Sequence, residues 1–306
     1  MQPDLWIPAR TPDGPRETLS ELASLHDFPA SGPMPDRMGH GDMLVSAHDV
    51  RAALQVIPRI EGLRVVQTFS AGVDSIVDRI PPGITLCNAT GVHDVSVAEW
   101  VLMAILASNR KLLPLVKAQG RGQWLRKREV ADDLDGANVL IVGYGSIGAA
   151  VEARLLPFGA RVVRVARRAR DGVLPIEDLP DLLPAADIVV ILLPLTPDTR
   201  RRVDADFLSH MREGALLVNA SRGGVVDTDA LIAALGAGRI RAALDVTDPE
   251  PLPDGHPLWS LPGVLITPHV AGDVRREEER AWGLVADQVA RLARGEPLRN
   301  VVVDGY

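Results

Sequence analysis

The stretch that most constrains this chain is VLIVGYGSIG, which runs from Val139 to Gly148. Its apolar start favours a buried strand and AAVEARLLPF after it favours a helix, so the glycines occupy a strand-to-helix turn. At this spacing the first glycine permits the tight turn, the second lets backbone approach a pyrophosphate, and the third lets helix and strand pack closely. The free N–H groups at the helix start attract phosphate oxygens. The alternative is a glycine-rich turn without a ligand. The predicted dinucleotide-binding residues are Gly143, Gly145, Ser146, Ile147 and Gly148.

Short apolar strands alternate with helical segments along the chain. Beyond residue 132 we expect six strands that are apolar without alternation, namely VLIVG, RVVRV, DIVVILL, GALLVNA, RAALDV and GVLITPH. Such runs are typical of parallel strands covered by helices on both faces. In the first third we expect strands at DLWIPA, DMLVSA, LRVVQTF and ITLCNA, with helices over residues 16–25 and 50–57. The sequence therefore predicts an α/β fold with doubly wound parallel sheets.

Two longer helical segments complete the pattern. The segment from Ser96 to Gln119 is interrupted by Pro114, which predicts two helices that meet near Leu113. We expect them to connect two domains. The last segment, Arg275 to Arg294, predicts a charged amphipathic helix that crosses back to the first domain.

Composition excludes several classes of protein. A net charge of −7 argues against binding to nucleic-acid phosphates, which requires clustered Lys and Arg. The N-terminal residues do not resemble a secretory leader, and the apolar run from Ile188 to Leu195 is too short to span a bilayer. A single cysteine, Cys87, excludes an intrachain disulfide, and the seven histidines show no metal-ligand spacing. We therefore expect a cytoplasmic protein without a metal, a membrane segment or a nucleic-acid partner.

The end of the second nucleotide-domain strand bears on the choice of cofactor. NAD-binding proteins usually place Asp or Glu about twenty residues after the glycines, to accept hydrogen bonds from the ribose. Ala166 stands at that place here, and Arg167 and Arg168 follow it. A guanidinium beside the ribose suits a 2′-phosphate, so we expect NADP to be preferred. Arg170 is a weaker third candidate. The alternative is that the arginines are solvated or stack on adenine, which leaves NAD usable.

Three residues after later strands suit the reduction of a carbonyl group. Arg222, Glu250 and His269 follow three successive strands, whose carboxyl ends share one edge of a parallel sheet. An imidazolium at His269 would stabilise and protonate the oxygen of a ketone that accepts hydride, and Glu250 would orient that ring. Arg222 would bind an α-carboxylate and polarise the carbonyl. Taken singly, each residue is more often structural; together they predict a catalytic set.

Several motifs in matching order resemble the D-isomer-specific 2-hydroxyacid dehydrogenases. They are GYGSIG, Leu193-Pro194-Leu195-Thr196, NASRGG from Asn219, ALDV from Ala243 with Glu250-Pro251, and Thr267-Pro268-His269. The resemblance runs from about Thr68 to Gly272. It implies a catalytic set of Arg222, Glu250 and His269, and it places Asp245 near the nicotinamide carboxamide. It also implies cofactor contacts at Leu193, Pro194, Thr199 and Ala220.

The same resemblance implies a domain arrangement and a substrate site. A Rossmann domain over residues 97–272 is expected to be inserted in a flavodoxin-like substrate domain formed by residues 1–96 and 273–306. The SAGVD segment is expected to bind the substrate carboxylate through the backbone N–H groups of Ala71 and Gly72. Ser70, Ala71 and Gly72 thus join Arg222 and His269 as substrate-binding residues. Family members are usually dimers, and here the helices within residues 95–119 would join the two copies.

Departures from the family pattern shape the functional expectation. Residues 1–60 match the family only in the alternation of strands and helices. His93-Asp94 stands where an asparagine is common in the family. Glu250 replaces the glutamine of formate dehydrogenases, which disfavours formate. The sequence ends at Tyr306 without a regulatory domain, which disfavours the longer phosphoglycerate dehydrogenases. We therefore expect an NADP-preferring reductase of a small 2-keto acid such as glyoxylate or hydroxypyruvate. The alternatives are an NAD-linked short phosphoglycerate dehydrogenase-like enzyme and a dinucleotide-sensing protein without turnover.

Overall fold

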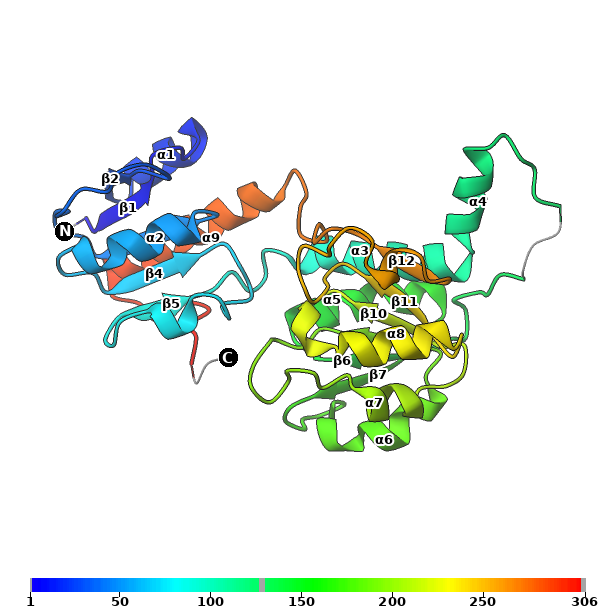
Figure 1. The fold of residues 1–306 in the computed structure, drawn as a ribbon. Helices are drawn as coiled ribbons and strands as arrows, with labels where there is room; N and C mark the ends of the chain where they lie inside the picture. The colour runs from blue at the N-terminus through cyan, green and yellow to red at the C-terminus, as the bar shows by residue number, and fades with distance from the viewer. Residues whose placement is uncertain (1, 127–129, 304–306) are drawn as a thin grey trace. The chain divides into compact units, whose positions relative to one another are not determined.

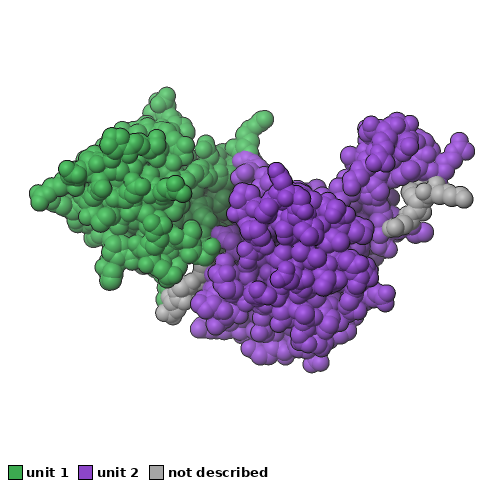
Figure 2. Space-filling model, viewed as in Figure 1, with its two compact units in different colours: residues 1–93, 275–306 green, residues 94–274 purple. Residues whose placement is uncertain are grey.

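The chain divides into two compact units in this computed structural model, which describes residues 2–126 and 130–303. Unit 1 comprises residues 1–93 and 275–306, and unit 2 comprises residues 94–274. Figure 2 colours the two units separately. Unit 1 is thus built from both ends of the chain, and unit 2 is inserted between them.

Unit 1 contains a five-stranded sheet in which every neighbouring pair is parallel. The strand order is β2-β1-β3-β4-β5, the flavodoxin-like order. The strands are β1 (Asp4–Pro8), β2 (Ser24–Phe28), β3 (Met43–Ala47), β4 (Val65–Thr68) and β5 (Thr85–Cys87).

Helices cover both faces of this sheet because its strands are apolar on both sides. Leu5 and Met43 pack on one face with α1 (Asp13–Ser20) and α9 (Glu277–Arg294). Trp6 and Leu44, the next residues along the same strands, pack on the other face with α2 (Val50–Val56). Figure 1 shows α2 and α9 on the sheet of this unit. The alternation of side chains along each strand thus supplies two separate cores.

The predicted helix over residues 16–25 is only partly present. The helix ends at Ser20, and residues 24–28 form the edge strand β2, which the pattern missed. This strand exposes much of its polar sequence SLHDF and buries Phe28 completely. An edge strand with one fully buried side chain carries a weak hydrophobic signal, which explains the error.

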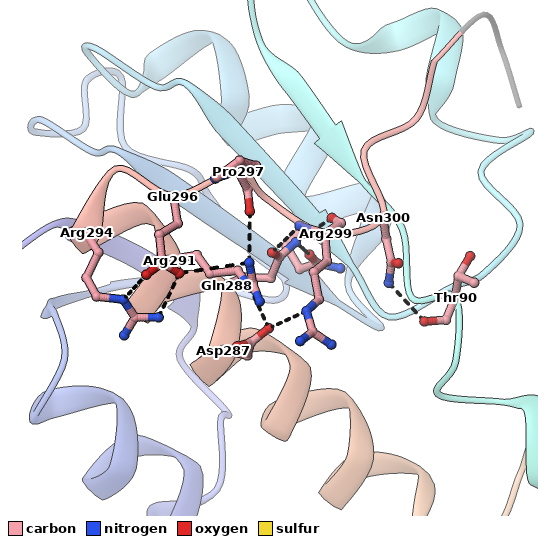
Figure 3. Close-up of polar contacts among 10 residues, drawn as sticks. Thr90, Asp287, Gln288, Arg291, Arg294, Glu296, Pro297, Arg299 and Asn300 are labelled. Atoms are coloured by element: carbon pink, nitrogen blue, oxygen red, sulfur yellow. Dashed lines mark hydrogen bonds and ion pairs between the residues drawn. The ribbon is translucent and has the colours of Figure 1, made fainter.

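A buried amide anchors the C-terminal segment in unit 1. Gln288 of α9 is fully buried and donates to Gln67 Oε1 at 3.0 Å and to the Arg299 carbonyl at 2.8 Å. The Arg299 amide donates back to Gln288 Oε1 at 2.8 Å. Figure 3 shows Gln288 and Arg299 within a wider set of contacts, in which Asn300 reaches the carbonyl of Thr90. These bonds fix the segment after α9 beside β5, where Val302 donates to Leu86.

Unit 2 contains a seven-stranded sheet that is also parallel at every pairing. The order β12-β11-β10-β9-β6-β7-β8 is the Rossmann order with one strand added at an edge. The α/β fold with two doubly wound parallel sheets is confirmed, and six predicted strands are present. The two-residue edge strand β8 was not predicted. The strands are β6 (Asn138–Val142), β7 (Arg161–Ala166), β8 (Leu174–Pro175), β9 (Ile188–Ile191), β10 (Leu216–Asn219), β11 (Arg241–Leu244) and β12 (Val264–Ile266).

Two helical layers cover this sheet. One layer contains α3 (Asp94–Asn109) and α5 (Ser146–Leu155), and the other contains α6 (Leu179–Leu182), α7 (Ala205–His210) and α8 (Thr228–Gly236). In Figure 1, α4 (Leu112–Gln119) projects from the body of the unit. None of the helices within residues 2–126 and 130–303 combines the length and apolar content that crossing a membrane requires.

The two helices predicted for this segment are present as α3 and α4, but the break between them lies slightly earlier than predicted. It lies at Lys111, which adopts a left-handed conformation with φ of 54°, rather than near Leu113. Pro114 stands in the first turn of α4, where its missing N–H removes no helical hydrogen bond. The proline therefore lies within the first turn of the second helix and does not mark the break.

Candidate active site

The loops that carry most of the predicted site residues leave one edge of the unit 2 sheet. The strands pair in register, with Asn219 opposite both Ile191 and Leu244, and Leu244 opposite Ile266. Val142, at the end of β6, pairs with Ile191 from the other side of β9. Because these residues end their strands, the loops after β6, β9, β10, β11 and β12 all start at the same level.

The glycine turn has the geometry that a pyrophosphate requires. Gly143 has φ of +103°, and a Cβ there would lie 2.6 Å from the carbonyl of Leu192. A Cβ on Gly148 would lie 3.3 Å from the Gly143 carbonyl oxygen, so helix α5 packs closely on the turn. A Cβ on Gly145 would meet no atom within 4 Å, which leaves room at the start of α5 for a ligand. The residues thus fit a dinucleotide phosphate at the helix N-terminus.

A polar cluster that the sequence analysis missed holds Tyr144 of this turn. The Arg164 Nε donates to Glu152 Oε1 at 2.8 Å and Oε2 at 2.9 Å, and the Tyr144 hydroxyl donates to the same carboxylate. Hydrogen bonding to Arg164 lowers the pKa of Glu152, so the carboxylate stays charged. Arg170 donates to the Tyr144 carbonyl. The available signal was Arg164 itself, because a charged residue inside an apolar strand requires a partner.

The arginines predicted to select the cofactor lie where β7 ends. Arg167 and Arg168 directly follow Ala166, the last residue of the strand, and both are exposed. The last residue of β6, Val142, pairs with Val165 of β7, so the two strands end at the same edge of the sheet. Arg167 and Arg168 therefore start from the same edge as the glycine turn. Their contact with a 2′-phosphate stays a prediction.

The loop after β9 is closed by a threonine. Thr199 Oγ1 donates to the Pro194 carbonyl at 2.6 Å and accepts from the Thr196 amide at 2.8 Å. Leu193 is buried beneath this loop, and Ala220 directly follows the neighbouring strand β10. These four predicted cofactor contacts, Leu193, Pro194, Thr199 and Ala220, therefore start from adjacent strand ends.

Arg222 is held by the turn that follows β10. The buried Asn219 accepts from the Ser221 amide at 3.1 Å and donates to the Arg222 carbonyl at 3.0 Å. Gly223 comes next, and a Cβ there would lie 1.9 Å from the carbonyl oxygen of Thr247. Only glycine permits this approach of two backbone segments, which fixes where Arg222 leaves the sheet edge.

His269 and Glu250 form a direct contact. The His269 Nδ1 lies 2.6 Å from Glu250 Oε1, and the two side chains are 46% and 44% exposed. A ring with Nδ1 bonded to a carboxylate has its orientation fixed and its Nε2 available for a reacting group. Arg222, Glu250 and His269 thus follow three adjacent strands, and the structure brings the last two into contact.

Asp245, predicted to lie near the nicotinamide carboxamide, is the most buried carboxylate of this edge at 2% exposure. Its Oδ1 accepts from the Val270 amide at 2.9 Å, and its Oδ2 accepts from the Ala271 amide at 2.9 Å. The Asp245 backbone carbonyl accepts from the His269 amide at 2.7 Å. Asp245 therefore anchors the loop that carries His269. Its contact with a carboxamide stays a prediction.

The predicted carboxylate-binding segment lies in unit 1, directly after β4. The Ser70 carbonyl accepts from the Ala89 amide at 3.0 Å, and the Ala71 carbonyl accepts from Asn88 Nδ2 at 3.1 Å. These bonds orient the loop Ser70–Gly72 by its carbonyl groups. The binding of a carboxylate by its amide groups remains a prediction.

An ion pair beside this loop was not anticipated. His48 follows β3, its ring meets Phe69 edge-on at a centroid distance of 5.3 Å, and its Nε2 lies 3.5 Å from Glu277 Oε2. Interaction with Glu277 raises the pKa of His48. Burial acts to raise the pKa of Glu277, but His48, His93 and Arg280 together lower it. A histidine and a glutamate so far apart in the sequence offered no signal for pairing.

Asp4, His40 and Asp42 bring potential ligand atoms within 4.8 Å of one another in the part of the chain that the structure describes. However, Asp4 Oδ1 lies 2.8 Å from His26 Nε2, and Asp42 Oδ1 lies 2.7 Å from an Arg64 nitrogen. Both carboxylates are thus engaged by other side chains, and the guanidinium would repel a metal ion.

Comparison with known proteins agrees with this geometry. Residues 102–271 match the family model described as the D-isomer specific 2-hydroxyacid dehydrogenase, NAD binding domain. The chain is 33% identical over 276 residues to D-3-phosphoglycerate dehydrogenase of Methanocaldococcus jannaschii, which covers 87% of this chain and 52% of that protein. It therefore spans about half the length of that relative. It is 34% identical over 248 residues to human glyoxylate reductase/hydroxypyruvate reductase, covering 77% and 76% of the two chains.

A solved structure is similar over the full length. The NADPH-dependent glyoxylate/hydroxypyruvate reductase from Sinorhizobium meliloti, in complex with NADP and sulfate, superimposes with a TM-score of 0.85. The two sequences are 25% identical, and the match covers 100% of both chains.

Replacement of Gly223 by alanine tests the turn that holds Arg222. The added methyl group would overlap the Thr247 carbonyl, so we expect Gly223→Ala to lower the free energy of unfolding by about 1–3 kcal/mol. Gly224→Ala is the matched control, because its Cβ would meet Leu195 at an ordinary 3.4 Å. Denaturant unfolding measures both, and equal stability of the two variants would contradict the close approach.

The His48–Glu277 pair predicts a pH window of stability. The raised pKa of His48 gives stabilisation that is fully present below its ordinary value of 6.5 and is lost as the pH rises through the folded value. The lowered pKa of Glu277 gives stabilisation that is present above its ordinary value of 4.5 and is lost as the pH falls through the folded value. An NMR titration should show the titration midpoint of His48 above pH 6.5 in the native protein. The midpoint should be lower in Glu277→Gln, because that variant removes the carboxylate that raises the pKa of His48. The control Glu279→Gln changes a carboxylate that pairs with Arg276 instead and should leave the midpoint unchanged. An unaltered midpoint in Glu277→Gln would refute the pairing.

Proposed function

Because this chain belongs to the D-isomer specific 2-hydroxyacid dehydrogenase family, we propose that it is an oxidoreductase that interconverts a small 2-keto acid and a D-2-hydroxy acid. Glyoxylate and hydroxypyruvate are the type of substrate. The observation that carries the proposal is the contact of His269 with Glu250 at the sheet edge from which Arg222 also emerges. The human relative is named for both substrates, as is the Sinorhizobium meliloti reductase.

Each residue has a defined task in the proposed reaction. The bound nicotinamide supplies the hydride that reduces the keto carbon. His269, as an imidazolium, donates a proton from Nε2 to the keto oxygen as the hydride arrives, and the ring becomes neutral. Glu250 holds Nδ1 and stabilises the positive charge that the ring carries before the transfer. Arg222 binds the keto oxygen and the α-carboxylate through its planar guanidinium.

Unit 1 contributes the remaining substrate contacts in this proposal. The Ser70 and Ala71 carbonyls accept hydrogen bonds within the unit, and the Ser70 amide donates to Thr68 Oγ1. We therefore assign the carboxylate to the amides of Ala71 and Gly72. Successive amide groups at the end of a strand form a concave site for an anion.

We further propose that NADP is preferred over NAD. Ala166 stands where NAD-binding proteins usually place an acidic residue, and the exposed Arg167 and Arg168 that follow it support this preference. The Sinorhizobium meliloti structure is described as NADPH-dependent and contains NADP. The NAD-linked alternative, a phosphoglycerate dehydrogenase-like enzyme, is favoured by the Methanocaldococcus jannaschii relative.

We also propose a homodimer joined through α3 and α4. Met103 of α3 and Leu112 and Val116 of α4 are 44%, 46% and 52% exposed. Exposed apolar side chains on a projecting helix are typical of an interface. Light scattering should give twice the chain mass of 32.9 kDa, and a monomer at micromolar concentration would contradict the proposal.

Steady-state kinetics with a panel of 2-keto acids and both nicotinamides tests the activity. We expect turnover of glyoxylate or hydroxypyruvate, and about 10²–10⁴-fold loss of kcat in His269→Gln, because a positioned acid contributes that much. Glu250→Gln should also lower kcat. Glu213→Gln, an exposed carboxylate just before β10 at the opposite sheet edge, is the control. Absence of turnover with every acid would favour the dinucleotide-sensing alternative.

The double substitution Arg167→Ala with Arg168→Ala tests the cofactor preference. Each charge-assisted hydrogen bond to a 2′-phosphate contributes about 1.5–3 kcal/mol, so NADPH affinity should fall by roughly tenfold or more. NADH affinity should change little because NADH lacks that phosphate. Arg161→Ala, an exposed arginine at the other end of β7, is the control in fluorescence titrations. An equal loss for both cofactors would contradict the assignment.

A further inference from the structure

The loop that carries His269 adopts a conformation that requires support. His269 has φ of 56°, in the left-handed region that side chains other than glycine rarely occupy. Its amide, and those of Val270 and Ala271, are bonded to the carbonyl and carboxylate oxygens of Asp245. A residue in this region persists only where the surrounding structure determines it. The orientation of the His269 ring therefore depends on the position of the Asp245 carboxylate.

A second chain of hydrogen bonds fixes that carboxylate from the opposite direction. The Thr267 hydroxyl donates to Asp245 Oδ1 at 2.6 Å and accepts from the indole Nε1 of Trp100 at 3.0 Å. An indole N–H can only donate, and a hydroxyl has a single proton, so every bond in this chain has one possible direction. Trp100 is 7% exposed and lies on α3, more than 160 positions before Thr267 in the sequence.

We propose that Trp100 is a positioning residue for the reaction, which orients the His269 loop through the Thr267 hydroxyl and the Asp245 carboxylate. The inference rests on the proposed function, because it takes His269 to be the proton donor. Trp100 does not act on substrate or cofactor in this scheme. It keeps Asp245 in the one orientation that can accept from Thr267, Val270 and Ala271 together.

Loss of the indole N–H would release the Thr267 hydroxyl to rotate. The hydroxyl would then adopt other orientations for part of the time and would not always donate to Asp245. The hydrogen bonds from the Val270 and Ala271 amides to the Asp245 carboxylate would break more often. The His269 ring would spend less time against Glu250, so fewer bound complexes would be ready for proton transfer. We therefore expect a loss in kcat with little change in KM, because the substitution removes no predicted substrate or cofactor contact and acts on His269 and Asp245 only through the mobility of their loop.

Trp100→Phe tests the first link, since phenylalanine retains an aromatic ring and removes the donor. We expect kcat to fall by roughly tenfold with KM values for acid and cofactor within twofold, and amide hydrogen exchange at Val270 and Ala271 to accelerate by a similar factor. Trp6→Phe is the matched control, because Trp6 is 8% exposed and its indole donates to the His40 carbonyl in unit 1. In an active protein, an unchanged kcat or an unchanged exchange rate in Trp100→Phe would overturn the proposal, as would an equal effect of Trp6→Phe.

Position 267 tests the second link without disturbing the packing of α3. Thr267→Val removes the hydroxyl and should reproduce the effects of Trp100→Phe, whereas Thr267→Ser retains the hydroxyl and should restore kcat to within threefold of the native value. In the double variant, Trp100→Phe should add little to Thr267→Val, because both break the same chain. Fully additive effects would overturn the proposal.

The exchange measurement separates this inference from the proposed function. It needs neither substrate nor turnover, so a protein without reductase activity could still show faster exchange at Val270 and Ala271 in Trp100→Phe. That result would reject the proposed reaction and retain the chain of hydrogen bonds from Trp100 to Asp245. Turnover in the native protein with no loss of kcat in Trp100→Phe would retain the reaction and reject the positioning role of Trp100.

Discussion

The in-register parallel pairing of β9, β10, β11 and β12 is the constraint on which the rest of the site depends. Each strand ends beside the last residue of its neighbour, as in the pairing of Asn219 with Leu244 and of Leu244 with Ile266. Neighbouring parallel strands lie about 4.8 Å apart, so side chains a few residues beyond these ends remain within reach of one another. The contact between His269 and Glu250 follows from this spacing. A slip of one residue in the register would turn each strand's side chains to the opposite face and separate them.

Much of this arrangement could be predicted from local sequence because local physics determines it. Runs such as VLIVG and DIVVILL are buried on both faces, so their hydrophobic signal is strong, and Gly143 is required by its positive φ. Two elements that are only partly buried were not predicted, because their hydrophobic pattern is weak. β2 buries only one of its five side chains and β8 has two residues, so neither carries a clear hydrophobic pattern. Lys111, between α3 and α4, has a left-handed conformation that its residue type does not indicate.

The polar clusters could not be predicted because their members meet only in three dimensions. Arg164 on β7 pairs with Glu152 on α5, and Trp100 on α3 donates to Thr267 after β12. The sequence shows that such buried or half-buried polar groups require partners, but several partners satisfy each one equally well. The choice follows from which helix covers which strand, and that is a property of the whole sheet.

The two carboxylates beside His269 illustrate how burial divides the work of similar groups. Asp245 is 2% exposed, and its oxygens accept from two amides and a hydroxyl, so the protein has replaced the water that would solvate it. Such a group is rigid and cannot follow a change in charge nearby. Glu250 is 44% exposed and contacts the imidazole through one oxygen, so its second oxygen stays available to respond as the ring gains or loses a proton. The buried acid therefore fixes the loop that carries His269, whereas the exposed acid orients the ring and acts on its electrostatics.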